Sequence, residues 1–390
     1  MSVLRGLTID NGGSELRYMP ETAEHKLGSI ETLSNEFYEI PEKEFREKDV
    51  HDRTALIRFK RAPKSEYLGI MAQGLTGRAY KGTRIFLSSQ EDKTGSLSYY
   101  RQFLFAVARD ALKKVLDELE DFMNQPAQGL FRKSEPTHIP TEYTYVITTC
   151  IPIREFSGSK NCAEILKTAL AGNYAVEFPL IPNCPTVKFT IDPACLGVTP
   201  EGGVVILSVR KEINPEDYTL MVDMGHNTAD ISLYKGTTPV GTVKSPNYAG
   251  TMLIGMLRAA LEDEGYRLTD EQTIQVLETN TVKRGTNTVD VSNIIKTCKQ
   301  SLVENFLKPE ILQLLTTNGI DTKSIQNRLF VGAPMSDRGT GSIPALITKA
   351  CQLENTNLLH LETGTRYANL GAAALFTTRM LKKAKELNFV

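Results

Sequence analysis

Two aspartates in this chain stand in the same local pattern. Asp10 and Asp223 each end an apolar run, and a glycine follows two residues later, Gly12 in TIDNGGSELR and Gly225 in MVDMGHNTADIS. A tight turn containing glycine directs several backbone N–H groups to one side and so binds phosphate oxygens. An aspartate beside it repels phosphate but accepts hydrogen bonds from the waters around Mg²⁺. One such turn is typical of an ordinary hairpin, whereas two in matching contexts indicate a nucleotide site.

Three further stretches fit that site, and each also has a purely structural interpretation. In CIPIREF, Glu155 lies in the turn after a strand, so it can orient a water at a γ-phosphate or simply be a solvated glutamate. In LFVGAPMSD, Gly332 ends a strand where backbone can approach an adenine, or it marks an ordinary turn. In RYANLGAAAL, Asn369 and Gly371 precede a helix of small residues, which suits a domain crossing, a hinge or tight packing.

Hydrophobic periodicity predicts the elements that must position these residues. Alternating apolar residues predict one hairpin over residues 3–19 and a second over 218–234. Apolar side chains that recur every three or four positions make 98–123 the clearest helix. Residues 200–209 fit either a strand or a helix. The remaining predicted helices cover 250–264, 292–307 and 370–387, and the remaining strands cover 143–149 and 329–333.

Length, charge and cysteine usage exclude several classes of protein. The 390 residues favour two domains. A formal net charge of −1 argues against a general affinity for nucleic acid, although a local basic patch stays possible. The six cysteines show no C-x-x-C pair or zinc spacing, as expected for reduced thiols in the cytoplasm. We expect neither a signal peptide nor a membrane-spanning segment.

The five stretches, in this order, resemble the nucleotide motifs of the actin-like ATPases. TIDNGGSELR resembles their first phosphate loop, CIPIREF the first connecting segment, MVDMGHNTADIS the second phosphate loop, LFVGAP the adenosine loop and YANLGAAA the second connecting segment. The form is most similar to the plasmid-segregation actins, the ParM-like family. The resemblance implies an α/β, actin-like ATPase fold: duplicated ribonuclease-H-like domains with a nucleotide cleft between them. It implies domains at 1–199, with a small lobe inserted at 28–79, and at 200–368, with a C-terminal helix at 369–390 returning to the first.

The resemblance also implies roles for individual residues. Asp10 and Asp223 would contact Mg²⁺ through water from opposite sides of the phosphates, and Glu155 would position the attacking water. Asp230 would mainly support the second hairpin. Two departures from the family stand out, since His226 replaces a small glycine and Ala333-Pro334 replaces further glycines. The residues implied to bind the nucleotide are Asn11, Gly12, Gly13, Ser14, Gly225, His226, Asn227, Thr228, Gly332 and Ala333.

The function implied is a filament that assembles with ATP, possibly GTP, and Mg²⁺ and disassembles after hydrolysis. Its partners would be further copies of itself and a DNA-binding adaptor of a plasmid partition system, with no direct contact to nucleic acid or membrane. Three alternatives share the fold. A small-molecule kinase would need a general base, a role open to Asp10. A non-polymerising ATPase would normally carry a substrate-binding module. A membrane-binding C-terminal helix is the third, with RMLKKAKELNFV as its basic segment.

Overall fold

The computed structural model divides the chain into two compact units. It describes residues 2–12, 15–21, 28–50, 52–85, 93–124, 139–156, 161–337, 339–361 and 364–387, so the predicted loop residues Gly13 and Ser14 lie outside the described residues. Unit 1 comprises Met1–Pro200 and Ala372–Val390, and unit 2 comprises Glu201–Gly371. The chain therefore crosses from one unit to the other after Pro200 and again after Gly371. No helix in the described ranges is long and apolar enough to cross a membrane.

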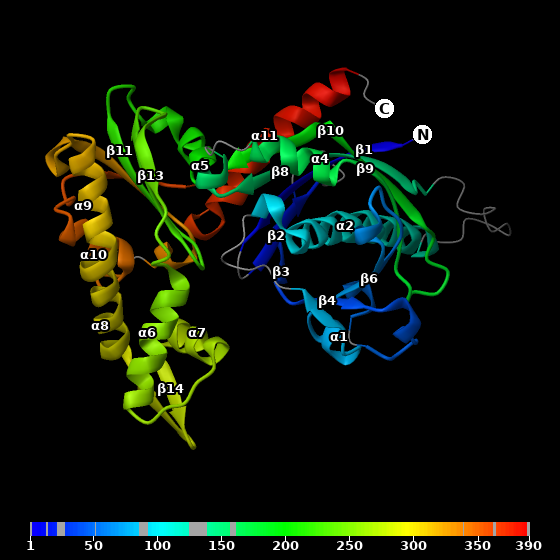
Figure 1. The fold of residues 1–390 in the computed structure, drawn as a ribbon, viewed down its shortest axis with the longest axis horizontal. Coiled ribbons are helices and arrows are strands. Elements are labelled where there is room, and N and C mark those ends of the chain that lie inside the picture. The colour runs from blue at the N-terminus through cyan, green and yellow to red at the C-terminus, as the bar shows by residue number, and fades with distance from the viewer. Residues whose placement is uncertain are drawn as a thin grey trace. The chain divides into compact units, whose positions relative to one another are not determined.

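Unit 1 is built on a ten-stranded sheet in the order β3-β2-β1-β8-β10-β9-β5-β6-β4-β7 (Figure 1). In this sheet β1 pairs antiparallel with β2 and parallel with β8, and β8 pairs parallel with β10. The strands are β1 (Val3–Asn11), β2 (Glu15–Pro20), β3 (Glu31–Ser34), β4 (Phe37–Ile40), β5 (Leu56–Arg61), β6 (Gly69–Gln73), β7 (Thr83–Ile85), β8 (Glu142–Ile151), β9 (Gly172–Glu177) and β10 (Val187–Pro200).

Unit 2 repeats part of this arrangement. Its five-stranded sheet has the order β13-β12-β11-β16-β17, in which β11 pairs antiparallel with β12 and parallel with β16. The order β3-β2-β1-β8-β10 has the same sequence of antiparallel and parallel pairs, with β1 in the place of β11. The strands are β11 (Tyr218–Met224), β12 (Ala229–Lys235), β13 (Thr238–Lys244), β16 (Ile325–Val331) and β17 (Asn357–Leu358).

Helices supply the rest of each core. In unit 1 they are α1 (Gly74–Ala79), α2 (Leu97–Asn124), α3 (Ile153–Phe156), α4 (Cys162–Leu170) and most of α11 (Ala368–Glu386). In unit 2 they are α5 (Gly203–Ser208), α6 (Gly250–Asp263), α7 (Asp270–Thr279), α8 (Ser292–Leu302), α9 (Lys308–Thr317) and α10 (Ile343–Ala350). A separate hairpin of β14 (Thr281–Arg284) and β15 (Asn287–Asp290) lies beside α7.

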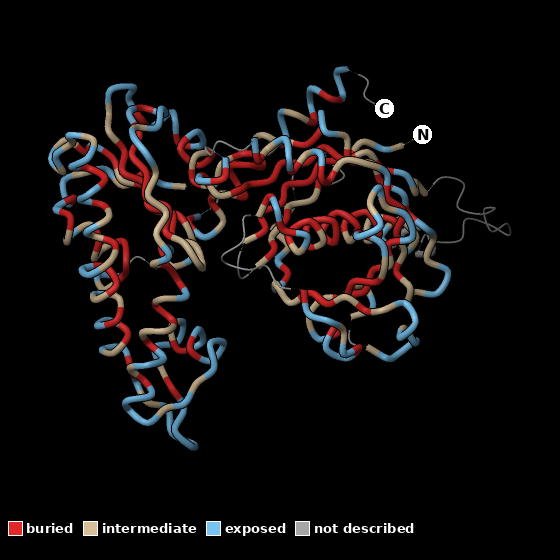
Figure 2. The backbone as a smooth tube through the Cα atoms, in the orientation of Figure 1, coloured by how far each residue is buried: buried red, intermediate tan, exposed pale blue. Residues whose placement is uncertain are grey.

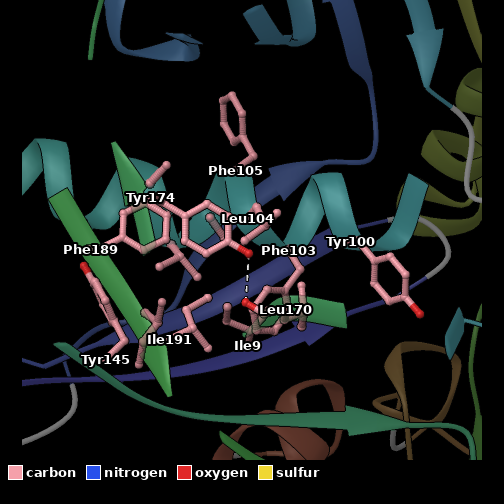
Figure 3. Close-up of a cluster of buried hydrophobic side chains, with 14 of the residues drawn as sticks. Ile9, Tyr100, Phe103, Leu104, Phe105, Tyr145, Leu170, Tyr174, Phe189 and Ile191 are labelled. Carbon is pink, nitrogen blue, oxygen red and sulfur yellow. Dashed lines mark hydrogen bonds between the residues drawn. The ribbon is translucent and has the colours of Figure 1, made fainter. Parts of the chain in front are cut away.

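Strand β1 is buried on both faces because helices cover each side of the sheet. Successive side chains of a strand point to opposite faces. Ile9 lies in the aromatic core with Phe103 and Leu104 of α2 (Figure 3). On the other face Thr8 Oγ1 hydrogen-bonds Thr377 Oγ1 of α11 at 2.7 Å. Figure 2 shows that most of β1 and β8 and the middle of α2 are buried.

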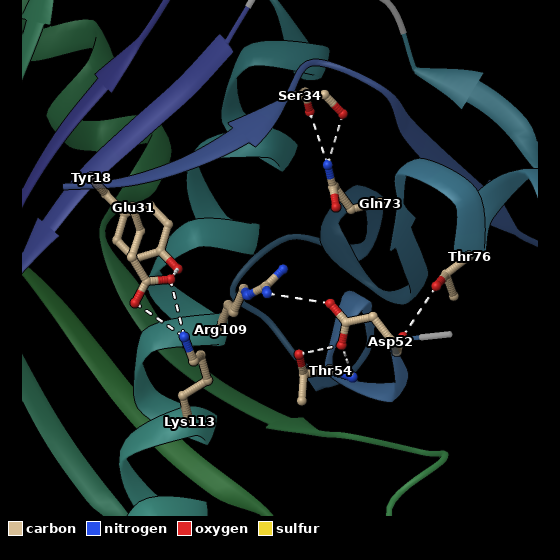
Figure 4. Close-up of polar contacts among 9 residues, drawn as sticks. All are labelled: Tyr18, Glu31, Ser34, Asp52, Thr54, Gln73, Thr76, Arg109 and Lys113. Carbon is tan, nitrogen blue, oxygen red and sulfur yellow. Dashed lines mark hydrogen bonds and ion pairs between the residues drawn. The ribbon is translucent and has the colours of Figure 1, made fainter. Parts of the chain in front are cut away.

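The strands β4, β5, β6 and β7 belong to the same sheet as the rest of unit 1, because β5 pairs with β9. Polar contacts attach this region to α2 (Figure 4). Asp52 accepts hydrogen bonds from Thr54 N at 2.8 Å and Thr54 Oγ1 at 2.6 Å, and Arg109 Nη2 of α2 approaches it at 3.4 Å. Glu31 in β3 is held in the same way by Lys113 of α2 at 3.1 Å. Sequence periodicity predicted none of these short strands individually.

The structure decides one element that the sequence left open and differs from the prediction in two others. The ambiguous segment 200–209 contains the helix α5, whose consecutive apolar residues are buried and therefore carry no helical periodicity. The helix predicted over 292–307 ends at Leu302, and a π-helical turn, Val303–Leu307, links α8 to α9. Pro309 at the start of α9 lacks an N–H group, which interrupts the α-helical bonding pattern there. The strand predicted over 329–333 begins at Ile325 and ends at Val331, so Ala333 starts a 3-10 turn.

A buried ion pair fixes α2 against the central sheet. Asp110 of α2 accepts hydrogen bonds from Arg5 Nη2 of β1 at 2.6 Å and from the Tyr145 hydroxyl of β8 at 2.6 Å, and Arg5 Nε contacts it as well. Burial alone would lower the pKa of Arg5, but the hydrogen bonds and attraction of Asp110 outweigh it and raise that pKa. The Arg5 guanidinium therefore stays charged at any ordinary pH.

We expect Asp110→Asn to reduce the free energy of unfolding by about 3–5 kcal/mol, because it leaves the Arg5 charge buried without a counter-charge. Urea unfolding followed by circular dichroism would measure the change. Lys188→Ala is the matched control, since its ion pair with Glu142 is exposed and 2.6 Å long; it should leave the unfolding midpoint unchanged. Equal effects of the two variants would contradict this account of the buried pair.

Candidate functional site

Asp10 lies near the end of β1, buried beside an arginine that the sequence motif did not single out. The pairing of β1 with β2 sets Asp10 directly opposite Arg17, and Arg17 Nη1 lies 3.6 Å from Asp10 Oδ2. Arg17 also donates to Glu15 Oε2 at 2.9 Å. An arginine so placed can bind a phosphate oxygen while screening the aspartate from it. Sequence reasoning missed Arg17, although counting the hairpin register from the turn would have paired it with Asp10.

Asn11, the residue after Asp10, carries polar side-chain atoms that no described residue satisfies. Asn11 is fully buried, and neither its amide nitrogen nor its amide oxygen has a hydrogen-bond partner among the described residues. Gly12 N donates to Glu15 O at 3.0 Å, which closes the turn, and the Asn35 amide donates to the Gly12 carbonyl. Buried polar groups normally have partners, so an unsatisfied asparagine beside the glycine turn is consistent with a ligand there.

The surroundings of Glu155 differ from the predicted ones. It lies in the short helix α3 rather than in a turn, and it is 5% exposed, so the interpretation as a solvated glutamate is wrong. Its Oε1 accepts from Lys93 N at 3.0 Å, and its Oε2 accepts from Thr94 N at 3.1 Å and Thr94 Oγ1 at 3.0 Å. α3 follows β8, the parallel neighbour of β1. Because parallel strands end at the same sheet edge, Asp10 and Glu155 both belong to the carboxyl edge of unit 1.

In unit 2, Asp223 occupies the position on β11 that Asp10 has on β1. It is 7% exposed, and Asn369 Nδ2 donates to its Oδ2 at 2.9 Å. The oxygen of the same Asn369 amide accepts from Gly202 N at 2.8 Å, so Asn369 cannot rotate without breaking both bonds. The register places Asp230 directly opposite Asp223 on β12, equally buried and in contact with the Ser245 hydroxyl. Two carboxylates on one face therefore meet at this strand end.

The backbone of the second loop, residues 225–228, is held at its carbonyl groups. Gly250 N and Thr251 N of α6 donate to the carbonyls of Gly225 and His226 at 3.2 and 2.7 Å. Within the described residues, the backbone N–H groups of His226 and Asn227 have no hydrogen-bond acceptor. Such amides can bind an anion. Thr228 O accepts from Gly225 N at 2.9 Å and closes the loop.

His226, which stands where the resemblance led us to expect a glycine, is half-buried in that loop. Burial lowers its pKa below the usual value, and the charge of Asp270 only partly opposes this. The imidazole is therefore neutral at pH 7 and adds no positive charge to the loop.

Gly332 has a structural reason to be glycine. It follows β16 with φ 98° and ψ 159°, a backbone conformation that is essentially limited to glycine. A Cβ at this position would lie 2.0 Å from the carbonyl oxygen of Met224, the last residue of β11. Gly332 thus allows β16 to end against the residue that precedes the second loop. Ala333 is exposed at the start of the following 3-10 turn.

Each unit therefore gathers the residues that the sequence predicted for it. In unit 1 these are Asp10, Asn11, Gly12 and Glu155 at the ends of β1 and β8; in unit 2 they are Asp223, the second loop and Gly332 at the ends of β11 and β16. Each set combines a buried carboxylate with a glycine turn, which is suited to holding phosphate and a hydrated cation. The placement of Asp10 and Asp223 on facing sides of one nucleotide stays a prediction.

No protein-family model and no curated protein sequence matches the chain. Solved structures match it over almost its whole length. The actin-like protein Alp7A has a TM-score of 0.68 at 14% identity, with 100% of both chains covered. A 15-stranded ParM filament from Clostridium botulinum gives 0.57 at 13% identity, covering 97% of this chain and 100% of that one. ParM from Bacillus thuringiensis with ATP gives 0.61 at 12%, covering 96% and 98%. This likeness confirms the predicted actin-like fold.

We expect Gly332→Ala to destabilise the protein by more than the roughly 1–3 kcal/mol of a strained backbone alone, because its Cβ collides with rigid backbone. Gly285→Ala is the matched control: it has φ 62° at the β14–β15 turn, and a Cβ there would meet nothing within 4 Å. Thermal unfolding followed by circular dichroism would compare the two. If both variants lost the same stability, the contact of Gly332 with Met224 would not be limiting.

Proposed function

We propose that this chain, which has the actin-like fold, is a nucleotide-dependent filament protein that binds ATP or GTP with Mg²⁺ and hydrolyses it. The observation that carries the proposal is the repeated strand arrangement, which puts a buried aspartate beside a glycine turn at the same place in both units, Asp10 in one and Asp223 in the other. The resemblance of both loops to those of the plasmid-segregation actins supports the same function.

The residues present suit a hydrated Mg²⁺ ion. Mg²⁺ bound to a nucleotide keeps several waters, and carboxylate oxygens are good acceptors for them. Asp10 and Asp223 supply such oxygens, and the hydrogen bond from Asn369 fixes the direction in which Asp223 presents its carboxylate. The ion would supply charge neutralisation on the phosphate oxygens. The amides of the two loops, together with Asn11, would bind the phosphates.

Glu155 would orient the water that attacks the γ-phosphorus. The water oxygen bonds to phosphorus as the bond to the bridging oxygen breaks, and the released phosphate carries away both protons of the water, one on the new oxygen and one on another phosphate oxygen. Phosphoryl transfer depends mainly on positioning and charge stabilisation, so a buried glutamate that only holds a water in place is sufficient. Arg17, next to Asp10, would counter negative charge on the phosphates.

Assembly would follow from linkage between nucleotide and conformation. A ligand shifts a conformational equilibrium only by its differential affinity for the two states, and loss of the γ-phosphate would remove contacts from one state. Subunits that repeat head to tail without closing form a filament. The chain passes between units at Pro200 and within α11 at Gly371, so these are our candidates for the hinge. An adaptor protein would link the filament to plasmid DNA.

We expect Asp223→Ala to lower nucleotide turnover on the order of a hundredfold, while nucleotide affinity changes far less. The substitution removes an acceptor for the waters around Mg²⁺, and a resulting displacement of the reacting groups by about 1 Å costs on that order in rate. Phosphate release at saturating nucleotide and equilibrium binding of a fluorescent nucleotide would measure the two effects. Filaments of the variant should persist longer than those of the wild type. Asp263→Ala, at an exposed position at the end of α6, is the control. Normal phosphate release by Asp223→Ala would contradict the assigned role.

We also expect the purified protein to assemble with ATP or GTP and Mg²⁺ and to disassemble after hydrolysis. Light scattering and sedimentation with ATP, with GTP and without nucleotide would follow assembly, and electron microscopy would identify filaments. A protein that stays monomeric with every nucleotide, yet phosphorylates a small metabolite, would be a kinase on the same fold.

A further inference from the structure

The contacts of Glu155 contain more information than its burial. Two consecutive residues, Lys93 and Thr94, direct three donors at its carboxylate, and all three distances lie between 3.0 and 3.1 Å. They belong to the 3-10 turn Lys93–Gly95, which precedes α2. The backbone donors would be present with any side chain at position 94, whereas the hydroxyl donor exists only because this residue is a threonine.

The number of acceptor positions limits what Glu155 can still bind. An ionised carboxylate accepts about four hydrogen bonds, two on each oxygen. Thr94 occupies both positions on Oε2, through its backbone N–H and its hydroxyl, and Lys93 N occupies one position on Oε1. Among the described residues, one position on Oε1 is therefore left without a donor. The carboxylate can hold a single water, and that water can lie in only one direction.

The turn that makes these bonds is itself fixed. Thr94 is buried, and its carbonyl oxygen accepts a hydrogen bond from the Tyr100 hydroxyl of α2. Burial and the negative charge of Glu155 raise the pKa of Tyr100 to about 12, so this hydroxyl keeps its proton at neutral pH and remains a donor. Thr94 is thus held on one side by α2 while it holds Glu155 on the other.

We propose that Thr94 is a positioning residue for nucleotide hydrolysis: its hydroxyl occupies the second acceptor position of Glu155 Oε2 and so restricts the carboxylate to one water, bound at Oε1. This inference rests on the proposed function of Glu155. Without the hydroxyl, Oε2 would offer a second position, and the carboxylate could rotate or recruit another water. A displacement of about 1 Å in a reacting group can cost on the order of a hundredfold in rate.

The test is a pair of substitutions that differ in the hydroxyl. Thr94→Val keeps the shape and removes the donor, and Thr94→Ser keeps the donor. We expect Thr94→Val to lower kcat for phosphate release by about tenfold or more with KM and nucleotide affinity unchanged, and Thr94→Ser to retain most of the rate. Thr76→Val is the matched control, because Thr76 is also buried in unit 1 and its hydroxyl donates to the Asp52 carbonyl at 3.1 Å; its kcat should equal that of the wild type.

The outcomes separate this inference from the function on which it rests. A wild type that hydrolyses no nucleotide would overturn the proposed function and this inference with it. A wild type that hydrolyses while Thr94→Val matches it would overturn the inference alone. The inference would also be overturned if Thr94→Ser lost as much kcat as Thr94→Val, or if Thr94→Val changed kcat and KM to the same extent. If Thr94→Val does not fold, Thr94→Ala removes the same donor without adding a methyl group and is compared in the same way.

Discussion

A carboxylate removed from water has to receive hydrogen bonds, and this requirement organises both units. An unpaired buried charge costs several kcal/mol, so each buried acid fixes the position of the groups that serve it. Asp110 joins α2 to two strands of the central sheet. Glu155 joins α3 to Thr94 before α2, and Asp223 joins β11 to Asn369, 146 residues further along the chain. The acids that are candidates for chemistry are thus also the points at which distant segments are attached to one another.

The sequence predicted the features that depend on neighbouring residues and missed those that depend on contacts between distant segments. Glycine turns and alternation predicted both hairpins, and apolar spacing predicted the helix over 98–123, which the structure extends to Leu97–Asn124. Five motifs in a fixed order were enough for the actin-like fold, which the solved structures confirm. Arg17 and Thr94 were missed, because their roles depend on a strand register and on a contact between segments 61 residues apart. The short strands of 31–85 were missed because mixed charges hide their alternation.

Glu155 and Gly332 show how a motif can identify a position without giving its reason. For Glu155 the choice offered by the sequence was a water-orienting acid or a solvated side chain, and burial with three donors removes the second. For Gly332 the sequence offered close approach by an adenine or an ordinary turn. The structure adds a third reason, the carbonyl of Met224. One glycine can therefore support the second loop whether or not a nucleotide base also lies against it.

The division of unit 1 into two stretches of sequence has a consequence for the order of synthesis. Leu381 and Ala384 of α11 cover Val146 of β8 and Cys195 of β10, and Lys385 pairs with the buried Glu21 at 3.1 Å. A ribosome makes all of unit 2 before it makes these residues. Domains generally fold as units, the N-terminal one first, but here the first sheet must wait with one apolar face uncovered until the last helix emerges. Unit 2 can complete its core earlier, although its sequence begins later.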